Sequence, residues 1–328
     1  MHARRAVSDS PHGRIGVVGG GSIGVGWAIV FARAGWPVTL VEPDAGRRAA
    51  LQGVLAARLD RLAANELLDG APASVAARVT VTGELAPALA AAVLVQECAP
   101  ESLELKRRLF REIEAAAPAD AILATSSSAL TISEIADDLD TRARCLVAHP
   151  GNPPYLLPVV ELVPAPFTDP LVLARARDLF AAAGMTPIHV RREIEGFVFN
   201  RLQGALLREA YCLVRDGVVS PADIDRVVRD GLGRRWGVIG PFETAELNTR
   251  GGITAHAAKM GPAYARMGAE RGQHDPWTPE LVELVAADVH RRLPPEQWEA
   301  NVTRRDEALS ELERVRRASD AFAHPDAD

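Results

Sequence analysis

The stretch RIGVVGGGSIGVGWAIVFARAG, residues 14–35, decides the fold of the first half of this chain. Arg14–Val18 is a short apolar run that predicts a buried strand, and the apolar residues after the glycines recur with helical spacing. The pattern between them is G-x-G-x-x-G. Gly19 permits the tight turn, Gly21 lets a phosphate approach the backbone, and Gly24 lets helix and strand pack closely. The N-terminus of such a helix favours a bound phosphate group.

A second strand and an acidic residue follow at the expected distance. Val38–Val41 is apolar, and Glu42 stands where an acid accepts hydrogen bonds from a ribose. Strand, glycine motif, helix, strand and acid in this order predict a site for a dinucleotide. Glu42 favours NAD over NADP because a 2′-phosphate would face its carboxylate. Arg47 and Arg48 lie nearby, and we place them on the solvent face of the next helix.

Further apolar runs alternate with helical patterns as far as residue 190. We expect a Rossmann-type α/β fold, with a doubly wound, mainly parallel sheet covered on both faces. Ligands then bind beyond the carboxyl ends of the strands. The expected strands are Arg14–Val18, Val38–Val41, Val79–Val81, Val93–Gln96, Ala121–Ala124, Cys145–Ala148, Val159–Val163 and Pro187–Val190.

The second part of the chain shows helical patterns and no convincing strand. We therefore expect an NAD-binding domain over residues 1–193, with 1–13 flexible, and an all-α domain over residues 194–328, with 318–328 flexible. A long helix is expected at Gly196–Arg215, with Phe197 and Asn200 on one face. Gly231–Glu243, GLGRRWGVIGPFE, is interpreted as a glycine-rich loop.

One candidate site lies at the end of the Cys145–Ala148 run, which leads into His149. Glu161 lies in the next apolar run, and the connection contains several prolines that stiffen it. If the two runs are neighbouring strands, the carboxylate orients the imidazole and leaves its other nitrogen free as a base. The alternative is a half-buried His and an edge-strand Glu with unrelated roles.

Two further polar groups remain open to two interpretations. The Ser126, Ser127 and Ser128 run either caps the helix that follows or belongs to a site in the same layer as His149. Asn200 either forms a hydrogen bond between helices or directs its amide at an active-site cleft.

Composition excludes several classes of protein. The 328 residues are 48% apolar and 24% charged, with a net charge of −6, which makes nucleic acid an unsuitable partner. Three separated cysteines give no metal or disulfide spacing and suit a reduced, cytoplasmic protein. We find no signal segment and no apolar run long enough to span a membrane.

Seven ordered stretches together resemble the 3-hydroxyacyl-CoA dehydrogenase family, and within it the branch of lambda-crystallin and L-gulonate 3-dehydrogenase. They are VGGGSIGVGWA, VQECAPESLELKRRLF, SSSALTI, VAHPGNPPYLLPVVELVP, EGFVFNRLQGALLREA, VSPADID and GLGRRWGVIGPFE. The resemblance implies an NAD-dependent oxidoreductase that oxidises the C3 hydroxyl of an L-3-hydroxy acid. It also implies a homodimer paired through the helical domains.

The resemblance assigns roles residue by residue. His149 matches the catalytic base, Glu161 its acidic partner, Ser128 the serine that contacts the reacting oxygen, and Asn200 the asparagine that completes the site. Beyond the glycines Gly19, Gly21 and Gly24, the residues implied as NAD contacts are Ser22, Ile23, Glu42, Glu101 and Lys106.

The substrate stays open at this stage. An Arg followed by an aromatic residue, as in Arg235-Trp236, occurs in the gulonate branch and in carnitine dehydrogenases, and an Arg fork suits a carboxylate. We therefore expect Arg235 to bind a free acid; the alternative is an Arg that braces the loop against Glu243. Gly151 replaces a larger residue of the family and predicts a wider pocket beside His149. Acyl-CoA, carnitine and structural, crystallin-like roles remain alternatives.

Overall fold

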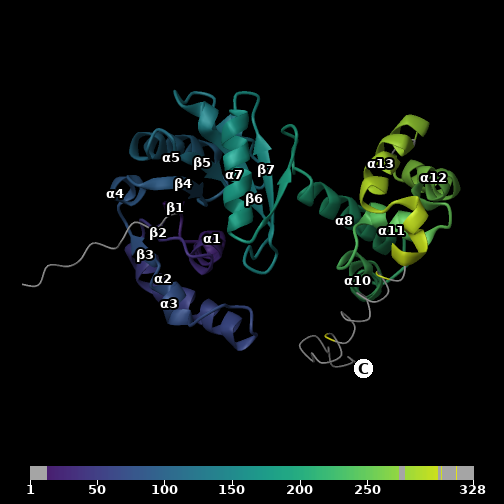
Figure 1. Ribbon diagram of the computed structural model, residues 1–328, viewed down its shortest axis with the longest axis horizontal. Helices are drawn as coiled ribbons and strands as arrows, with labels where there is room; N and C mark the ends of the chain where they lie inside the picture. Colours follow the sequence, from purple (N-terminus) through teal and green to yellow (C-terminus); the bar gives the residue numbers. More distant parts are fainter. Residues whose placement is uncertain (1–12, 273–277, 302–303, 305–314, 316–328) are drawn as a thin grey trace, which may run out of the picture. The chain divides into compact units, whose positions relative to one another are not determined.

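The computed structural model describes residues 13–272, 278–301, 304 and 315, which form two compact units that meet in sequence between Leu207 and Arg208 (Figure 1). The expected flexible ends lie outside the described residues, apart from Gly13. The expected boundary between the NAD-binding domain and the all-α domain, after residue 193, stays a prediction.

The first unit is built on one sheet of eight strands in the order β3-β2-β1-β4-β5-β6-β7-β8. Neighbouring strands run parallel except β6 and β7, which are antiparallel. The predicted fold class is therefore confirmed. The strands are β1 Arg14–Val18, β2 Val38–Val41, β3 Val79–Thr82, β4 Ala92–Glu97, β5 Ile122–Thr125, β6 Cys145–Pro150, β7 Val159–Pro164 and β8 Thr186–His189.

Two apolar cores lie on the two faces of this sheet, as strand geometry requires. Along β6, Leu146 and Ala148 belong to one core, while Cys145 and Val147 belong to the other. The first core contains residues of α1, α2 and α7, and the second contains residues of α4, α5 and α6. Burial on both faces explains why the strands read as continuous apolar runs. The helices of this unit are α1 Ser22–Arg33, α2 Ala45–Ala64, α3 Pro72–Ala76, α4 Leu85–Leu89, α5 Leu103–Ala116, α6 Ile132–Ala136 and α7 Pro170–Ala182.

The second unit contains helices around a small core formed by Leu247, Ile253, Ala286, Val289 and Leu293. Its helices are α9 Pro221–Val227, α10 Gly233–Trp236, α11 Pro241–Asn248, α12 Gly252–Glu270 and α13 Pro279–Arg292, and α8 Phe199–Arg215 leads into it from the first unit. Among the described helices, none is long and apolar enough to cross a membrane.

Two expectations in this region were wrong. Gly231–Glu243 is not a loop: a π-helical turn at Val228–Leu232 runs into α10, and α11 begins at Pro241. The interpretation as a loop gave too much weight to the glycines, each of which disfavours a helix by only about 1 kcal/mol relative to Ala. Phe197 does not share a helical face with Asn200, since it precedes α8 and has a positive φ of 48°.

Candidate active site

The glycine-rich turn lies between β1 and α1, as predicted. Gly19 has φ 111°, and a Cβ on Gly24 would lie 1.8 Å from the carbonyl oxygen of Gly19, so neither position tolerates another residue. A Cβ on Gly21 would meet nothing within 4 Å, and no side chain caps α1 there. The backbone at Gly21, Ser22 and Ile23 can therefore be approached by a phosphate group.

Glu42 is fixed beside this turn. Its side chain is only 5% exposed, and its two carboxylate oxygens accept from the N–H groups of Gly20, at 3.1 Å, and of Asp44, at 3.0 Å. Arg48 donates to the carbonyl oxygens of Glu42 and Pro43. Because the guanidinium of Arg48 is bound to these carbonyls, it does not neutralise the Glu42 carboxylate, which stays the charged group beside the turn. This arrangement suits the ribose hydroxyls of NAD and disfavours a 2′-phosphate.

His149 and Glu161 are directly opposite each other on the antiparallel strands β6 and β7, which Figure 1 shows next to each other. His149 Nδ1 lies 2.8 Å from Glu161 Oε2, and both side chains are buried. An ionised carboxylate only accepts, so Nδ1 donates to it. The second ring nitrogen, Nε2, is then deprotonated in the neutral imidazole and can act as a base.

The other oxygen of Glu161 binds the start of α8. Oε1 accepts from the N–H groups of Val198, at 2.7 Å, and Phe199, at 2.9 Å. Burial alone would raise the pKa of Glu161, but the hydrogen bond from His149 and those from Phe199 and Val198 outweigh it and lower the pKa. Glu161 is thus ionised at neutral pH and joins the dyad to the helix that carries Asn200.

Two aromatic rings enclose the imidazole. The ring centroid of Phe197 lies 5.6 Å from that of His149, and the centroid of Phe199 lies 6.3 Å away. Phe197 is fully buried despite its positive φ, a conformation that costs a non-glycine residue about 1–2 kcal/mol. The packing against His149 and the N–H groups held by Glu161 determine this turn.

Ser128 and Asn200 are brought together. Asn200 Nδ2 donates to the main-chain carbonyl of Ser128 at 3.1 Å, so the amide bonds to a loop and not to another helix. Ser128 itself is exposed beyond the end of β5. The helix α6 is capped by Thr131 and Glu134, and the serine run therefore does not serve as its cap.

Lys106 belongs to a buried charge network that reaches Glu101, whose side chain is 37% exposed. Lys106 is 1% exposed and donates to both oxygens of Glu97, at 3.0 and 2.9 Å, and to the carbonyl of Ala99. Glu97 is fully buried and also accepts from Thr125 Oγ1 at 2.6 Å. The predicted contacts of Glu101 and Lys106 with NAD stay predictions.

The expected widening at Gly151 was wrong. A Cβ at this position would lie 2.9 Å from Leu157 Cβ and 3.2 Å from Val159 Cγ1. Leu157 and Val159 thus take up the space that a side chain would need. The glycine reflects close packing of the proline-rich loop and adds no volume beside His149.

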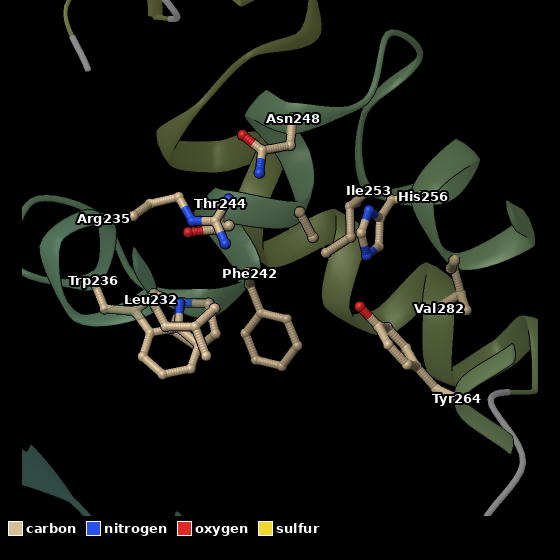
Figure 2. A pocket seen from close by; sticks show the side chains of 13 residues that line it. Leu232, Arg235, Trp236, Phe242, Thr244, Asn248, Ile253, His256, Tyr264 and Val282 are labelled. Atoms are coloured by element: carbon tan, nitrogen blue, oxygen red, sulfur yellow. The ribbon is translucent and has the colours of Figure 1, made fainter. Parts of the chain in front are cut away.

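Arg235 lines a cavity of about 600 Å³ within the second unit (Figure 2). Its Nε is buried and has no hydrogen-bond partner among the described residues, and the same is true of Thr244 Oγ1 in the same cavity wall. The expected alternative, a brace to Glu243, is not observed, since no ion pair of Arg235 occurs in the described part of the chain. The cavity is otherwise mostly apolar, with Trp236, Phe242 and Tyr264 among its lining residues.

Comparison with known families assigns the chain. Residues 14–194 match the model of the 3-hydroxyacyl-CoA dehydrogenase NAD-binding domain, and residues 196–289 match the C-terminal domain model of the same family. The chain belongs to the 3-hydroxyacyl-CoA dehydrogenase family. Like other members, it is an NAD-dependent dehydrogenase that acts on a small molecule.

The similar proteins in this family carry different names. The chain is 39% identical to a lambda-crystallin homolog of Bos taurus, over 87% of this chain and 88% of the relative. It is 38% identical to an L-carnitine dehydrogenase of Streptomyces griseus, over 85% and 79%. A solved NAD⁺-dependent dismutase, 5-formyl-3-hydroxy-2-methylpyridine 4-carboxylic acid 5-dehydrogenase, has a TM-score of 0.70 and 27% identity and covers 85% of this chain and 96% of its own.

Three residues of this 3-hydroxyacyl-CoA dehydrogenase site were missed by sequence reasoning. Phe197 was expected on a helix, and no individual role was predicted for Glu97 or Thr125, which end two strands at the edge where ligands bind. For Glu97 a signal existed, because an acid at the end of a buried strand and a lysine on the following helix form a pair that can be buried together. For Phe197 the sequence carried none, since its contacts come from residues far away along the chain.

Proposed function

We propose that the protein reversibly oxidises the C3 hydroxyl of an L-3-hydroxy acid with a free carboxylate to the 3-keto acid, with NAD as oxidant. The observation that carries the proposal is the buried 2.8 Å contact between His149 Nδ1 and Glu161 Oε2. A base oriented in this way accepts the hydroxyl proton at Nε2 as the alcohol is oxidised. Bound NAD supplies the acceptor for the hydride.

Glu161 has two roles in the proposed reaction. Its charge stabilises the imidazolium that forms when His149 takes up the proton, and its hydrogen bond keeps the proton of neutral His149 on Nδ1. In the reductive direction the same His149 Nε2–H donates its proton to the carbonyl oxygen. The aromatic rings of Phe197 and Phe199 exclude water from one side of the imidazole and strengthen the ion pair.

Ser128 and Asn200 hydrogen-bond the reacting oxygen and fix its position. Ser128 is an exposed residue, as a residue that meets a substrate must be. Asn200 uses one amide proton on the Ser128 carbonyl, which leaves a second N–H for the substrate. The two residues thus form one unit, since a change in Asn200 also releases the Ser128 loop.

The residues of the first unit fit NAD. A Cβ would clash at Gly19 and Gly24 but not at Gly21, where the backbone must stay open for a pyrophosphate. We propose that the backbone at Gly21, Ser22 and Ile23 holds the pyrophosphate and that Glu42 accepts from the ribose. Glu42 is already oriented by two backbone N–H groups, which lowers the entropic cost of binding.

We propose that Arg235 binds the substrate carboxylate, so that no CoA is needed. Arg235 lines a cavity whose wall also contains Thr244, and its buried Nε and the Thr244 hydroxyl have no hydrogen-bond partner among the described residues. An unpaired buried donor costs about 1–3 kcal/mol, which a carboxylate ligand would recover. Two relatives are named after compounds that carry a carboxylate, L-carnitine and a pyridine carboxylic acid.

The experiment that tests the free-acid proposal compares Arg235→Met with Arg234→Met. Arg234 is the matched control because it already pairs with Asp230, at 3.7 Å. Loss of a charged hydrogen bond, about 1.5–3 kcal/mol, should raise KM for a free 3-hydroxy acid roughly 10- to 150-fold in Arg235→Met. KM in Arg234→Met should change less than threefold. Equal KM values in both variants would assign Arg235 a structural role.

We propose that the protein is a homodimer. The support is α8, in which no residue is buried although several are apolar. The exposed apolar side chains of this helix are Leu202, Leu206, Leu207 and Tyr211. A patch of this kind marks a protein interface. Light scattering of the purified protein distinguishes one chain from two, and a monomer at micromolar concentration would refute the pairing.

We propose a cytoplasmic location. The support is chemical, since the three cysteines, Cys98, Cys145 and Cys212, are free thiols. Free thiols persist in a reducing compartment. Fractionation of cells that express the protein tests this, and enzyme activity found only outside the cytoplasmic fraction would refute it.

A further inference from the structure

The loop that carries Ser128 is bound by a single carboxylate oxygen. Glu101 Oε1 accepts from three consecutive backbone N–H groups, those of Ser128 at 3.1 Å, Ala129 at 3.0 Å and Leu130 at 3.3 Å. The hydroxyl of Ser127 donates to the same oxygen. Consecutive N–H groups that converge on one point form a nest for an anion. In this loop the anion is a side chain of the protein itself.

Glu101 is in turn held by the buried network behind it. Its Oε2 lies 3.5 Å from Lys106 Nζ, and that ammonium is fixed by both oxygens of Glu97. Glu97 and Lys106 compensate each other's charge in the interior. Glu101 therefore receives its orientation from residues that cannot move without breaking a buried ion pair.

The contacts of Glu101 are divided between its two oxygens. Four donors from residues 127–130 surround Oε1. Oε2 lies 3.5 Å from the Lys106 ammonium, which also contacts Glu97 and the Ala99 carbonyl. The side chain as a whole is 37% exposed, so Oε1 is committed to the Ser128 loop while the predicted cofactor contact stays compatible with this geometry.

We propose that Glu101 is a positioning residue that acts through Ser128, with Lys106 and Glu97 as its support. The inference rests on the proposed function, since it gives Ser128 the contact with the reacting oxygen. Glu101 fixes the N–H side of the loop, and Asn200 binds the Ser128 carbonyl from the other side. These two hydrogen bonds fix the backbone of Ser128, which limits where its hydroxyl can lie and preorganises it for the transition state.

The ionised form of Glu101 is the form that binds. Burial alone would raise its pKa, but the Ser127 hydroxyl, the Lys106 ammonium and the N–H groups of Ala129 and Leu130 outweigh it and lower the pKa. Glu101 is therefore charged throughout the neutral range. Replacing it with Gln keeps the size and removes the charge on which the nest depends.

The test is a double-mutant cycle with Glu101→Gln and Ser128→Ala. Ser128→Ala should lower kcat about 10²-fold, the effect of losing one oxyanion donor. Glu101→Gln should lower kcat about tenfold when Ser128 is present and less than twofold in the Ser128→Ala background, a coupling within the range of contacting residues. KM for the hydroxy acid should stay within threefold of the starting protein in Glu101→Gln.

Glu193→Gln is the matched control. Glu193 accepts from the backbone N–H of Ser133, at 2.8 Å, and from the Ser133 hydroxyl, so it makes the same kind of contact with the first turn of the neighbouring helix α6. This variant should leave kcat unchanged in both backgrounds. Should Glu101→Gln not fold by circular dichroism, Ser127→Ala removes a donor from the same carboxylate oxygen and should show the same dependence on Ser128.

Three other outcomes would each refute a different part of the proposal. A tenfold loss from Glu101→Gln in both backgrounds would overturn the action through Ser128. A weakened Kd for NADH in Glu101→Gln, measured by tryptophan fluorescence quenching, together with a loss of kcat that does not depend on Ser128, would make Glu101 a cofactor contact only and also overturn the inference. An unchanged kcat in Ser128→Ala would instead refute the role of Ser128 in the proposed function, and the inference with it.

Discussion

Glu161→Gln is the substitution that the structure makes most specific. Gln has the size of Glu, and its one amide oxygen can still accept from the N–H groups of Val198 and Phe199. If the oxygen stays there, the NH₂ group must occupy the position of Oε2, 2.8 Å from His149 Nδ1. An NH₂ group only donates, so Nδ1 must become the acceptor and the proton of neutral His149 moves to Nε2.

The expected loss of kcat in Glu161→Gln follows from the altered tautomer of His149. With Nε2 protonated, the nitrogen that should accept the substrate proton is no longer a base. In a serine protease triad the analogous carboxylate-to-amide change lowers kcat about 10⁴-fold. We expect a loss of about 10³- to 10⁴-fold in kcat for oxidation at neutral pH, which is roughly 4–5.5 kcal/mol of barrier. The start of α8 keeps its hydrogen bonds, so the thermal midpoint should move by only a few degrees.

Two assays check this reasoning. Initial rates of NADH formation give kcat, and ¹⁵N NMR of histidine-labelled protein reports which nitrogen of His149 carries the proton. The expected result is a protonated Nε2 together with the large loss of kcat and a folded protein. A kcat within tenfold of the unsubstituted protein would refute the dyad as the source of the base. A large loss with the proton still on Nδ1 would refute the tautomer argument alone.

Three further predictions follow from buried charges. Lys106→Met leaves the carboxylate of Glu97 without its partner and should destabilise the protein by about 3–5 kcal/mol in urea unfolding, most of which the added change Glu97→Gln should restore; a loss below about 1 kcal/mol would contradict it. Glu42→Ala should raise KM for NAD roughly 10- to 100-fold, from loss of a charged hydrogen bond, and KM for NADP much less; equal changes would contradict a ribose contact. Because folding lowers the pKa of Glu161 from its ordinary 4.5, its stabilisation is complete above that pH and is lost as the pH falls through the lower folded pKa. The thermal midpoint should therefore fall more steeply below pH 4.5 in the unsubstituted protein than in Glu161→Gln.

Strands and the dinucleotide turn were predictable because they depend on local sequence. Arg14–Val18 and Val38–Val41 occur as predicted, and the three glycines occupy the turn between β1 and α1. Period and residue type decide such features within a few residues. The prediction for Gly231–Glu243 was wrong because its glycines are typical of a loop. The segment nevertheless contains the end of the π-helical turn, α10 and the start of α11.

The dyad was predictable as a possibility, and its geometry was not. The apolar run that leads to His149 and the run that contains Glu161 predicted neighbouring strands, and the structure pairs these two residues directly. The bonds from Glu161 to Val198 and Phe199 join positions 37 and 38 residues apart, so sequence spacing gave no sign of them. The same holds for Glu101, whose contacts with the Ser128 loop span 27 residues.

Glu161 therefore links the catalytic base His149 to the start of helix α8. One oxygen orients the base, and the other holds the first N–H groups of α8, the helix that carries Asn200. A substitution that shortens this side chain, Glu161→Asp, cannot reach both partners. Loss of activity in Glu161→Asp would thus combine two effects, which is why Glu161→Gln is the more informative variant.

We propose that this dehydrogenase oxidises a free 3-hydroxy acid with NAD. Initial rates of NADH formation with L-gulonate, L-carnitine and L-3-hydroxybutyrate, each beside L-3-hydroxybutyryl-CoA, with NAD and NADP in parallel, test this proposal. We expect turnover of at least one free acid, with NAD preferred over NADP. Turnover of the CoA thioester alone would refute the free-acid proposal and make Arg235 a structural residue.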